Sequence, residues 1–176
     1  MMSIMRANGL LLALLSLLAC GGDDDGGESG DPGDPVSLSE ADETCGRFSD
    51  HADTCGWGGN INGTDWNCGE AAIVWRADVF RAVATCAIDL ACDGDGRSCL
   101  EQGAGFDPLP IHDQYAATCD TKSGECELTP DSDASTLLLA CSATFMAAYA
   151  TPMMDAILAC FDEPCAAVVP CLDDTL

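Results

Sequence analysis

The sequence predicts an all-α protein in which two small disulfide-stapled helical units follow a disordered tether. Three observations support this fold class. Thirteen of the 176 residues are cysteines, a density close to that of disulfide scaffolds. Twelve of the cysteines form two frames of six that share an order of long and short spacings. Between these cysteines, apolar side chains recur at intervals of three and four residues, which is the spacing of amphipathic helices.

The two cysteine frames indicate an internal duplication. The steps between cysteines are 10, 13, 18, 6 and 7 residues in the first frame and 7, 15, 19, 5 and 6 in the second. An aromatic residue follows the third cysteine at a similar distance in both, Trp75 and Tyr149. This match predicts a tandem repeat with one helical unit per frame. The frames consist of Cys45, Cys55, Cys68, Cys86, Cys92 and Cys99, and of Cys119, Cys126, Cys141, Cys160, Cys165 and Cys171.

We expect these twelve cysteines to form six disulfides, each inside one unit. The sequence contains no Cys-x-x-Cys pair, which zinc knuckles, dithiol redox sites and c-type haem attachment require. An even number of cysteines in an exported chain favours disulfides, each of which contributes about 2–4 kcal/mol. Six cysteines allow many pairings, so the connectivity stays open. In the first unit we expect Cys55–Cys68 to close a turn between two helices.

The first 19 residues have the features of an export signal. Arg6 precedes an apolar run from Leu10 to Ala19, about half of the ~20 residues that a membrane-spanning helix needs. The run ends in Leu17-Leu18-Ala19-Cys20, which resembles the bacterial lipobox. The resemblance implies that Cys20 becomes the mature N-terminus and that its sulfur carries diacylglycerol. Acyl chains contribute roughly 0.8 kcal/mol per buried CH₂, so several of them hold a folded domain on a membrane.

Residues 20–36 are expected to form the lipidated cysteine and a disordered acidic tether. Residues 21–35 contain six acids, six glycines and two prolines and no large apolar side chain, so they cannot form a core. The predicted organisation is a signal peptide over residues 1–19, the tether over 20–36, a first unit over 37–103, a connector over 104–112 and a second unit over 113–176.

In the first unit, Ser37 and Glu40 form a capping-box pattern, which predicts a helix that continues to about Cys55, before Gly56. A long amphipathic helix is predicted from Cys68 to Leu90, with Ile73 and Phe80 on its apolar side. Arg76 falls within the apolar stripe, and we expect its long side chain to reach solvent; a buried ion pair is the alternative.

The loop between these helices contains Trp57 and Trp66. Packing over the helix turn is the simpler interpretation of these tryptophans, and contact with a ligand or glycan, together with residues 60–62, is the alternative.

In the second unit, three prolines at positions typical of helix starts predict three helices. Thr129-Pro130 opens the first, whose buried stripe comprises Leu138, Cys141, Phe145 and Tyr149. Thr151-Pro152 opens the second in the same manner. Glu163-Pro164 opens a short last helix, which we expect to end near Pro170.

The charge balance limits the classes of partner. The sequence contains thirty acidic and six basic residues, for a formal net charge of −24. This charge argues against nucleic acid and anionic lipid headgroups as ligands. The acids are scattered, so we interpret them mainly as solvating groups. Asp93 and Asp95 lie in an EF-hand-like loop whose first and twelfth positions, Ala91 and Gln102, are not acidic, so we expect a polar turn. Asp131 and Asp133 are interpreted as an acidic first helical turn, so no metal site is predicted.

No catalytic residue or cofactor is predicted. The two histidines, His51 and His112, have no serine or cysteine partner in a known motif, and no Gly-x-Ser-x-Gly sequence occurs. We therefore expect both to be surface histidines.

Taken together, the lipobox-like Leu17-Leu-Ala-Cys20-Gly-Gly-Asp-Asp-Asp stretch and the Cys160…Cys165…Cys171-Leu ending resemble the small cysteine-rich lipoproteins of myxobacteria-like Gram-negative genomes. The resemblance implies a lipid-anchored, all-helical, disulfide-stapled domain in the periplasm or on the outer membrane, and no assigned reaction. Gly21 stands where an inner-membrane retention signal has Asp, so the resemblance favours the outer membrane.

Three functional hypotheses follow. The first is a non-catalytic envelope protein with an interaction or structural role, attached to the membrane through its lipid and contacting an envelope protein or glycan. The second is an acidic Ca²⁺-binding surface protein. The third is an enzyme with an unrecognised site, for which His51 and His112 are the residues to test.

Overall fold

The computed structural model describes residues 31–128 and 138–175, and within these ranges the protein is helical. They contain eight α-helices and one 3₁₀ helix, with two isolated β-bridges and no β-strand. The all-α prediction is therefore confirmed. None of the helices in these ranges is long and apolar enough to cross a membrane.

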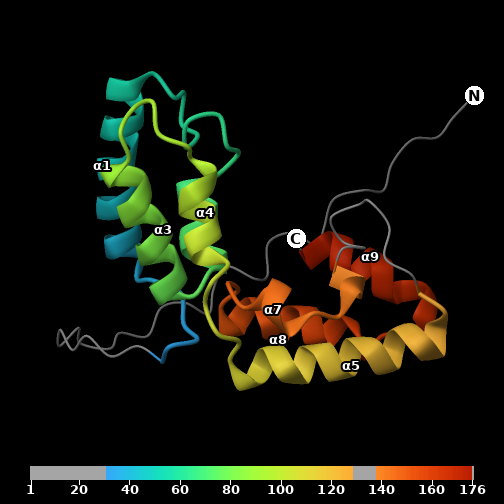
Figure 1. Ribbon diagram of the computed structural model, residues 1–176. Coiled ribbons are helices and arrows are strands. Elements are labelled where there is room, and N and C mark those ends of the chain that lie inside the picture. The colour runs from blue at the N-terminus through green and yellow to red at the C-terminus, as the bar shows by residue number, and fades with distance from the viewer. Residues whose placement is uncertain (1–30, 129–137, 176) are drawn as a thin grey trace, which may run out of the picture.

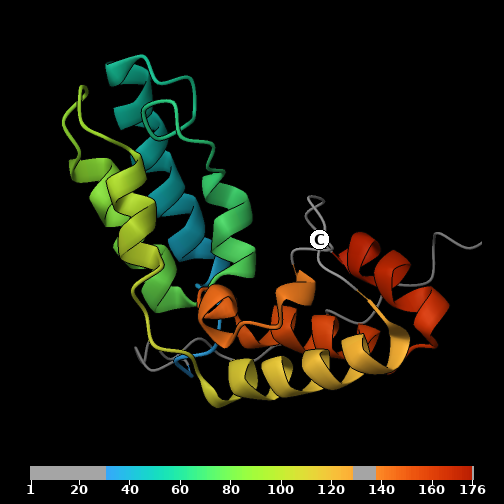
Figure 2. The same ribbon diagram turned by 45° about the vertical axis from the view of Figure 1, so that its right-hand side comes forward.

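The helices form two units that meet near one end, so that the molecule has the outline of an L (Figures 1 and 2). In Figure 1 the first unit stands upright and the second lies across, with α5 along its lower side. The first unit comprises α1 (Leu38–Cys55), α2 (Cys68–Val74), α3 (Ala77–Asp89) and α4 (Arg97–Gly103). The second comprises α5 (Pro110–Cys126), the 3₁₀ helix η1 (Leu138–Ala140), α7 (Ala143–Met146), α8 (Thr151–Cys160) and α9 (Cys165–Thr175). Because α5 begins at Pro110, the second unit starts within the stretch predicted as a connector.

All twelve frame cysteines are paired, and every pair lies within one unit. In both units the first cysteine joins the third, the second joins the fifth, and the fourth joins the sixth. The loops closed by equivalent bonds have nearly the same length: 23 and 22 residues, 37 and 39, and 13 and 11. The bonds are Cys45–Cys68, Cys55–Cys92 and Cys86–Cys99, and Cys119–Cys141, Cys126–Cys165 and Cys160–Cys171.

This shared connectivity confirms the tandem repeat and corrects one expectation. Cys55 does not pair with Cys68, because the loop after α1 carries Cys68 back beside Cys45, nearly three helical turns before Cys55. Six disulfides are typical of an exported protein in an oxidising compartment.

Helix α1 has the ends that its sequence predicts. The Ser37 side chain accepts a hydrogen bond from the Glu40 N–H, and Gly56 closes the helix in the left-handed conformation. Phe48 and Ala52 face the core of the first unit. In the first turn of α1, Glu40 accepts two hydrogen bonds from Arg81 of α3.

The predicted long helix from Cys68 to Leu90 is wrong, because the chain breaks into α2 and α3. Trp75 and Arg76 have extended backbone angles, with ψ values of 153° and 144°. The periodic pattern continues across the break, so the sequence alone does not reveal it. One consequence is that Ile73, expected on the apolar side, is 65% exposed.

The break in the first unit pairs with the equivalent break in the second. Trp75 and Tyr149, the aromatic residues that follow the third cysteine in each frame, face each other in an antiparallel β-bridge. The bridge thus relates the two copies by a local two-fold arrangement. Its hydrogen bonds run from the Arg76 N–H to the Ala148 carbonyl (2.9 Å) and from the Ala150 N–H to the Val74 carbonyl (2.8 Å).

The Arg76 side chain lies at this junction and is 4% exposed. Its guanidinium donates to the carbonyl oxygens of Pro32 (3.2 Å), Asp107 (2.9 Å) and Ala147 (3.0 Å), which belong to three different segments. A fourth bond, of 2.6 Å, goes to the carboxylate of Asp78. The expectation that Arg76 reaches solvent is therefore wrong. Its guanidinium is buried, is paired with the partly exposed Asp78 carboxylate, and donates three further hydrogen bonds to backbone carbonyls.

Residues 31–36, predicted as part of the disordered tether, are packed against both units. The Gly33 carbonyl accepts from the N–H of Thr151, the first residue of α8, at 2.6 Å. The Asp34 carbonyl accepts from the N–H of Ala77, the first residue of α3, at 2.8 Å. A side chain at Gly33 would collide with the Thr151 hydroxyl, so this close approach requires glycine. Consecutive carbonyls thus cap one helix of each unit.

The second unit differs from its prediction in three places, the first of which is α5, where no helix is predicted. Residues 129–137, where a helix is predicted to begin, lie outside the described residues, and beyond them the chain forms η1 and α7 in place of one long helix. Phe145, predicted to be buried, is 53% exposed, and Cys141 adopts a positive φ of 52°. Helix α8 begins at Thr151 as predicted. Helix α9 continues past Pro170 because Cys171 is bonded to Cys160 and Leu172 is fully buried.

The two units have separate hydrophobic cores. The first is centred on Phe48, Phe80 and Val83, with Trp66 against them. The second contains Tyr115, whose hydroxyl donates to the Leu138 carbonyl and whose burial raises its pKa to about 12. Since the cores do not merge, the angle between the units depends on the polar junction at Arg76.

We expect Arg76→Ala to lower the free energy of unfolding by about 3 kcal/mol, because it leaves buried carbonyls and the Asp78 carboxylate without their partner. Denaturant unfolding with the disulfides intact measures this loss. Arg97 is exposed on α4, so Arg97→Ala removes the same charge as a control and should change stability by less than about 0.5 kcal/mol. Equal effects of the two substitutions would contradict the role given to Arg76.

Candidate functional site

The cysteines are structural wherever the structure describes them. Each of the twelve frame cysteines is oxidised, so none offers a thiolate as a nucleophile or a metal ligand. Cys20, the predicted lipidation site, lies outside the described residues. Asp131 and Asp133 also lie outside them. Among the residues that are described, no group of three or more His, Cys, Asp or Glu side chains could hold a metal ion.

The Asp93–Asp95 loop is a polar turn, as predicted. The Asp95 carboxylate accepts from the Arg97 N–H at 3.0 Å and so stabilises the start of α4. Gly96 packs directly beneath the Ile61 backbone, and the Asn62 side chain donates to the Gly94 carbonyl. The residues that precede α2 thus hold this loop in place. The Asp95 carboxylate bonds within the loop, and Asp93 is exposed.

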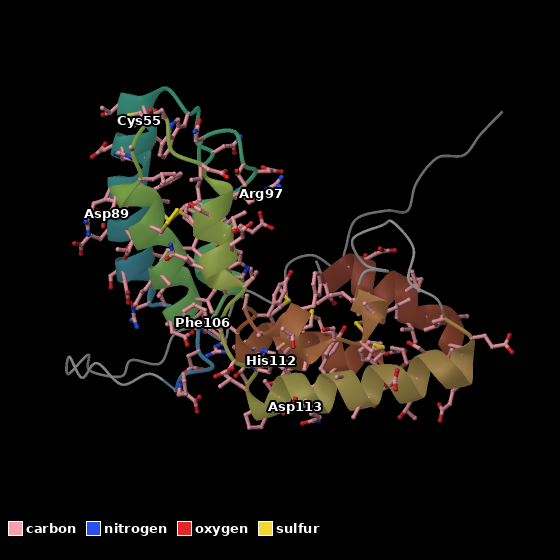
Figure 3. All side chains as sticks on the ribbon, viewed as in Figure 1. Cys55, Asp89, Arg97, Phe106, His112 and Asp113 are labelled. Atoms are coloured by element: carbon pink, nitrogen blue, oxygen red, sulfur yellow. A yellow bond between two sulfur atoms is a disulfide. The ribbon has the colours of Figure 1, made fainter. Side chains whose placement is uncertain are left out.

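His112 is not a surface residue, which corrects the prediction for it. The side chain is fully buried at the start of α5, near Phe106 and the junction (Figure 3). Its Nδ1 accepts the Leu109 N–H at 2.8 Å, so its Nε2 carries the proton and donates to the Tyr149 carbonyl at 3.0 Å. Burial lowers the pKa of the imidazole below 6.5, its ordinary value. His112 therefore joins the connector to the bridge residue of the second unit.

His51 is half-buried on α1 and also serves packing. Its Nε2 lies 2.8 Å from the Leu90 carbonyl, and its ring meets the edge of Trp57 at 5.0 Å. The sulfur of Cys55 is 3.7 Å away but belongs to a disulfide, so the pair is not a nucleophile and base. Trp57 donates to the Cys92 carbonyl and packs over the helix turn, as predicted.

A cleft with a volume of about 440 Å³ lies between the two units. We call it the inter-unit cleft. Both units contribute aromatic walls, since Trp75 comes from the first and Tyr149 and Phe145 come from the second. Trp75 and Tyr149 are half-buried. The lining residues are Asp65, Trp66, Asn67, Glu70, Ala71, Val74 and Trp75 from the first unit, and Leu138, Phe145, Tyr149 and Met153 from the second.

A second recess of about 400 Å³ adjoins the cleft and shares Trp75 and Phe145 with it. We call it the apolar pocket, because no charged side chain lines it in the described chain. Its walls are Val79, Leu100, Gly103 and Ala104 from the first unit, and Ser142, Thr144 and Ala148 from the second, besides the shared Trp75 and Phe145. The two recesses together form a surface that neither unit has alone.

The inter-unit cleft is negatively charged. The exposed carboxylates of Asp65 and Glu70 lie along it, and none of its described lining residues is Lys or Arg. Burial, and to a smaller extent the Glu70 carboxylate, raises the pKa of Tyr149, so its phenol stays protonated and available as a hydrogen-bond donor.

Trp66 forms the inner wall of the cleft. It is 5% exposed and packs edge-on against Phe48 at 4.9 Å, while its ring lies 6.5 Å from that of Trp75. Its indole N–H is the one buried side-chain polar atom in the described residues that has no hydrogen-bond partner. An unsatisfied buried donor of this kind costs about 1–3 kcal/mol.

Sequence reasoning did not predict this site. It identified Trp75 and Tyr149 as markers of the repeat and placed Phe145 and Tyr149 in a buried stripe. It named Trp66 as a ligand contact only in the alternative interpretation. The signal that could have found the site is the recurrence of an aromatic residue after the third cysteine, since equivalent positions of a tandem repeat often meet at the contact between copies.

Comparisons with known proteins add no assignment. A scan against protein-family models found no match to the chain, and searches of curated proteins and of solved structures found none either.

Stability should depend on pH through His112. Its pKa is lowered in the folded state, so the unfolded chain binds the proton more readily, and stability falls as the pH drops below about 6.5. The Glu40 carboxylate, whose pKa Arg81 holds below 4.5, contributes only at more acidic pH. Denaturant unfolding between pH 7.5 and about 5.5 should therefore show a decline that His112→Gln reduces. Parallel curves for the two proteins would contradict this assignment.

Proposed function

We propose that this protein is a non-catalytic binding protein of the bacterial envelope, anchored by a lipid on Cys20, whose binding surface is the inter-unit cleft with the adjoining apolar pocket. The observation that carries the proposal is the cleft itself. Partly exposed aromatic side chains converge there from two units, and exposed aromatic recesses mark interaction sites.

The chemistry of the described residues supports binding in preference to catalysis. Both nitrogens of His112 are engaged, His51 contacts a disulfide and a carbonyl, and the frame cysteines are oxidised. The cleft therefore brings together aromatic faces and carboxylates without a paired nucleophile and base. No observation on the described residues favours the alternative Ca²⁺-binding hypothesis, since their carboxylates are dispersed.

Support for the location comes from the disulfides and from the lipobox-like sequence. Oxidised cysteines in this number need an oxidising compartment, which the periplasm or the cell surface supplies. A lipid on Cys20, followed by a short acidic segment, would hold the junction of the units close to the membrane, because residues 31–36 are packed at that junction. The outer membrane is the membrane we propose, from the resemblance at Gly21.

Anchoring is tested by expressing the full chain in a Gram-negative host. We expect the wild-type protein to enter the detergent-rich phase on detergent phase separation and to sediment with outer membranes. Cys20→Ser removes the acylated sulfur and should leave the protein in the aqueous phase. Intact mass before and after reduction then measures the acyl groups and the disulfides together. A wild-type protein that partitions like Cys20→Ser has no lipid anchor.

The binding surface is tested by site-specific photocrosslinking in the cells that make the protein. A benzoylphenylalanine at Phe145, which is 53% exposed between the two recesses, should yield a discrete envelope adduct. The same probe at Arg47, exposed on α1 away from both recesses, is the control and should yield none. Absence of an adduct at Phe145, or the same adduct at both positions, would rule out the cleft as the binding surface.

A further inference from the structure

We propose that the inter-unit cleft and the apolar pocket together bind a peptide segment of a partner protein, with a lysine or arginine side chain in the cleft and a neighbouring apolar side chain in the pocket. This inference rests on the proposed function and specifies the chemistry of its ligand.

The first step is the charge of the cleft. Asp65 and Glu70 line it, both exposed, and no described lining residue carries a positive charge. Arg76 follows Trp75 directly, but its guanidinium is bound to Asp78 and to three carbonyl oxygens at the junction. The cleft therefore has carboxylates whose cation must come from a ligand. The net charge of −24 further favours the approach of a basic partner.

The second step is the aromatic lining. Trp75, Tyr149 and Phe145 line the same recess as the two carboxylates. Cations bind over aromatic faces because the ring quadrupole is negative there, and the alkyl stem of a lysine or arginine packs well against the ring. A basic side chain thus uses the aromatic rings and the carboxylates at once, whereas an apolar ligand would leave the carboxylates facing it unpaired.

The third step separates a peptide from a small ammonium compound. The apolar pocket adjoins the cleft through Trp75 and Phe145, and the two volumes, about 440 and 400 Å³, are comparable. A small cation would fill only the cleft. A peptide places side chains of different character a few ångströms apart and can occupy both.

The test uses the full mature chain with its disulfides intact and synthetic peptides as probes. Each acetylated and amidated peptide carries one lysine and one leucine, separated by glycine spacers of increasing length. We expect at least one spacing to bind in calorimetric titrations at low salt. In that peptide, replacing lysine with glutamine, or leucine with serine, should weaken binding by about fivefold or more.

Two matched variants test whether the Glu70 carboxylate binds the lysine of the peptide. Glu70→Gln removes a cleft carboxylate and should weaken the binding of the lysine peptide about two- to fivefold. Glu43→Gln makes the same change in net charge at an exposed position of α1 outside both recesses, and should bind like the wild type. Neither carboxylate is buried, so both variants should keep the native circular dichroism spectrum.

Several outcomes would overturn the inference. They are the absence of binding at every spacing, equal binding of the lysine and glutamine peptides, equal effects of Glu70→Gln and Glu43→Gln, and choline binding as tightly as the peptide. Binding of an uncharged chitooligosaccharide in place of the peptides would assign the cleft to glycans. If the peptides fail while the Phe145 probe still forms its specific adduct, the proposed function stands and only the ligand class is wrong. If both fail, neither proposal holds.

Discussion

The guanidinium of Arg76 holds together the parts of this protein that no common core joins. It donates to carbonyl oxygens before α1, in the connector and in the second unit, and it pairs with Asp78 within its own helix. A buried cation is costly unless every donor finds a partner, and here the partners come from segments far apart in the chain. Because these partners must surround the guanidinium at the same time, they fix the angle between the units.

Around this contact, the duplication produces a surface that a single unit lacks. The helix breaks of the two copies pair through Trp75 and Tyr149, so equivalent residues meet across a local two-fold relation. The relation is imperfect, since the position of Arg76 in one copy corresponds to Ala150 in the other. One arginine thus serves both copies, and the inter-unit cleft opens beside it. Buried His112 adds a further bond from the connector to Tyr149, which ties the cleft wall to the junction.

Disulfides explain how such small units keep open recesses. Each core is small, and each unit has three disulfide bonds that restrict its unfolded chain. Stability therefore does not require every aromatic residue to be buried, and Phe145 and Trp75 remain partly available at the surface. A rigid, oxidised frame of this kind would preorganise the binding surface that we propose, which reduces the entropy lost on binding.

The sequence by itself determined the fold class, the repeat, the containment of disulfides within units and the ends of α1, because these follow from spacing and capping residues that act locally. It also restricted Arg76 to two alternatives. Only the tertiary structure decided between them, since burial depends on carbonyls supplied from residues 32, 107 and 147. The break after Val74, the burial of His112, the exposure of Phe145 and the cysteine connectivity have the same origin. Each depends on a contact between segments that are distant in sequence. The periodicity of apolar residues along the chain does not indicate which segments come into contact.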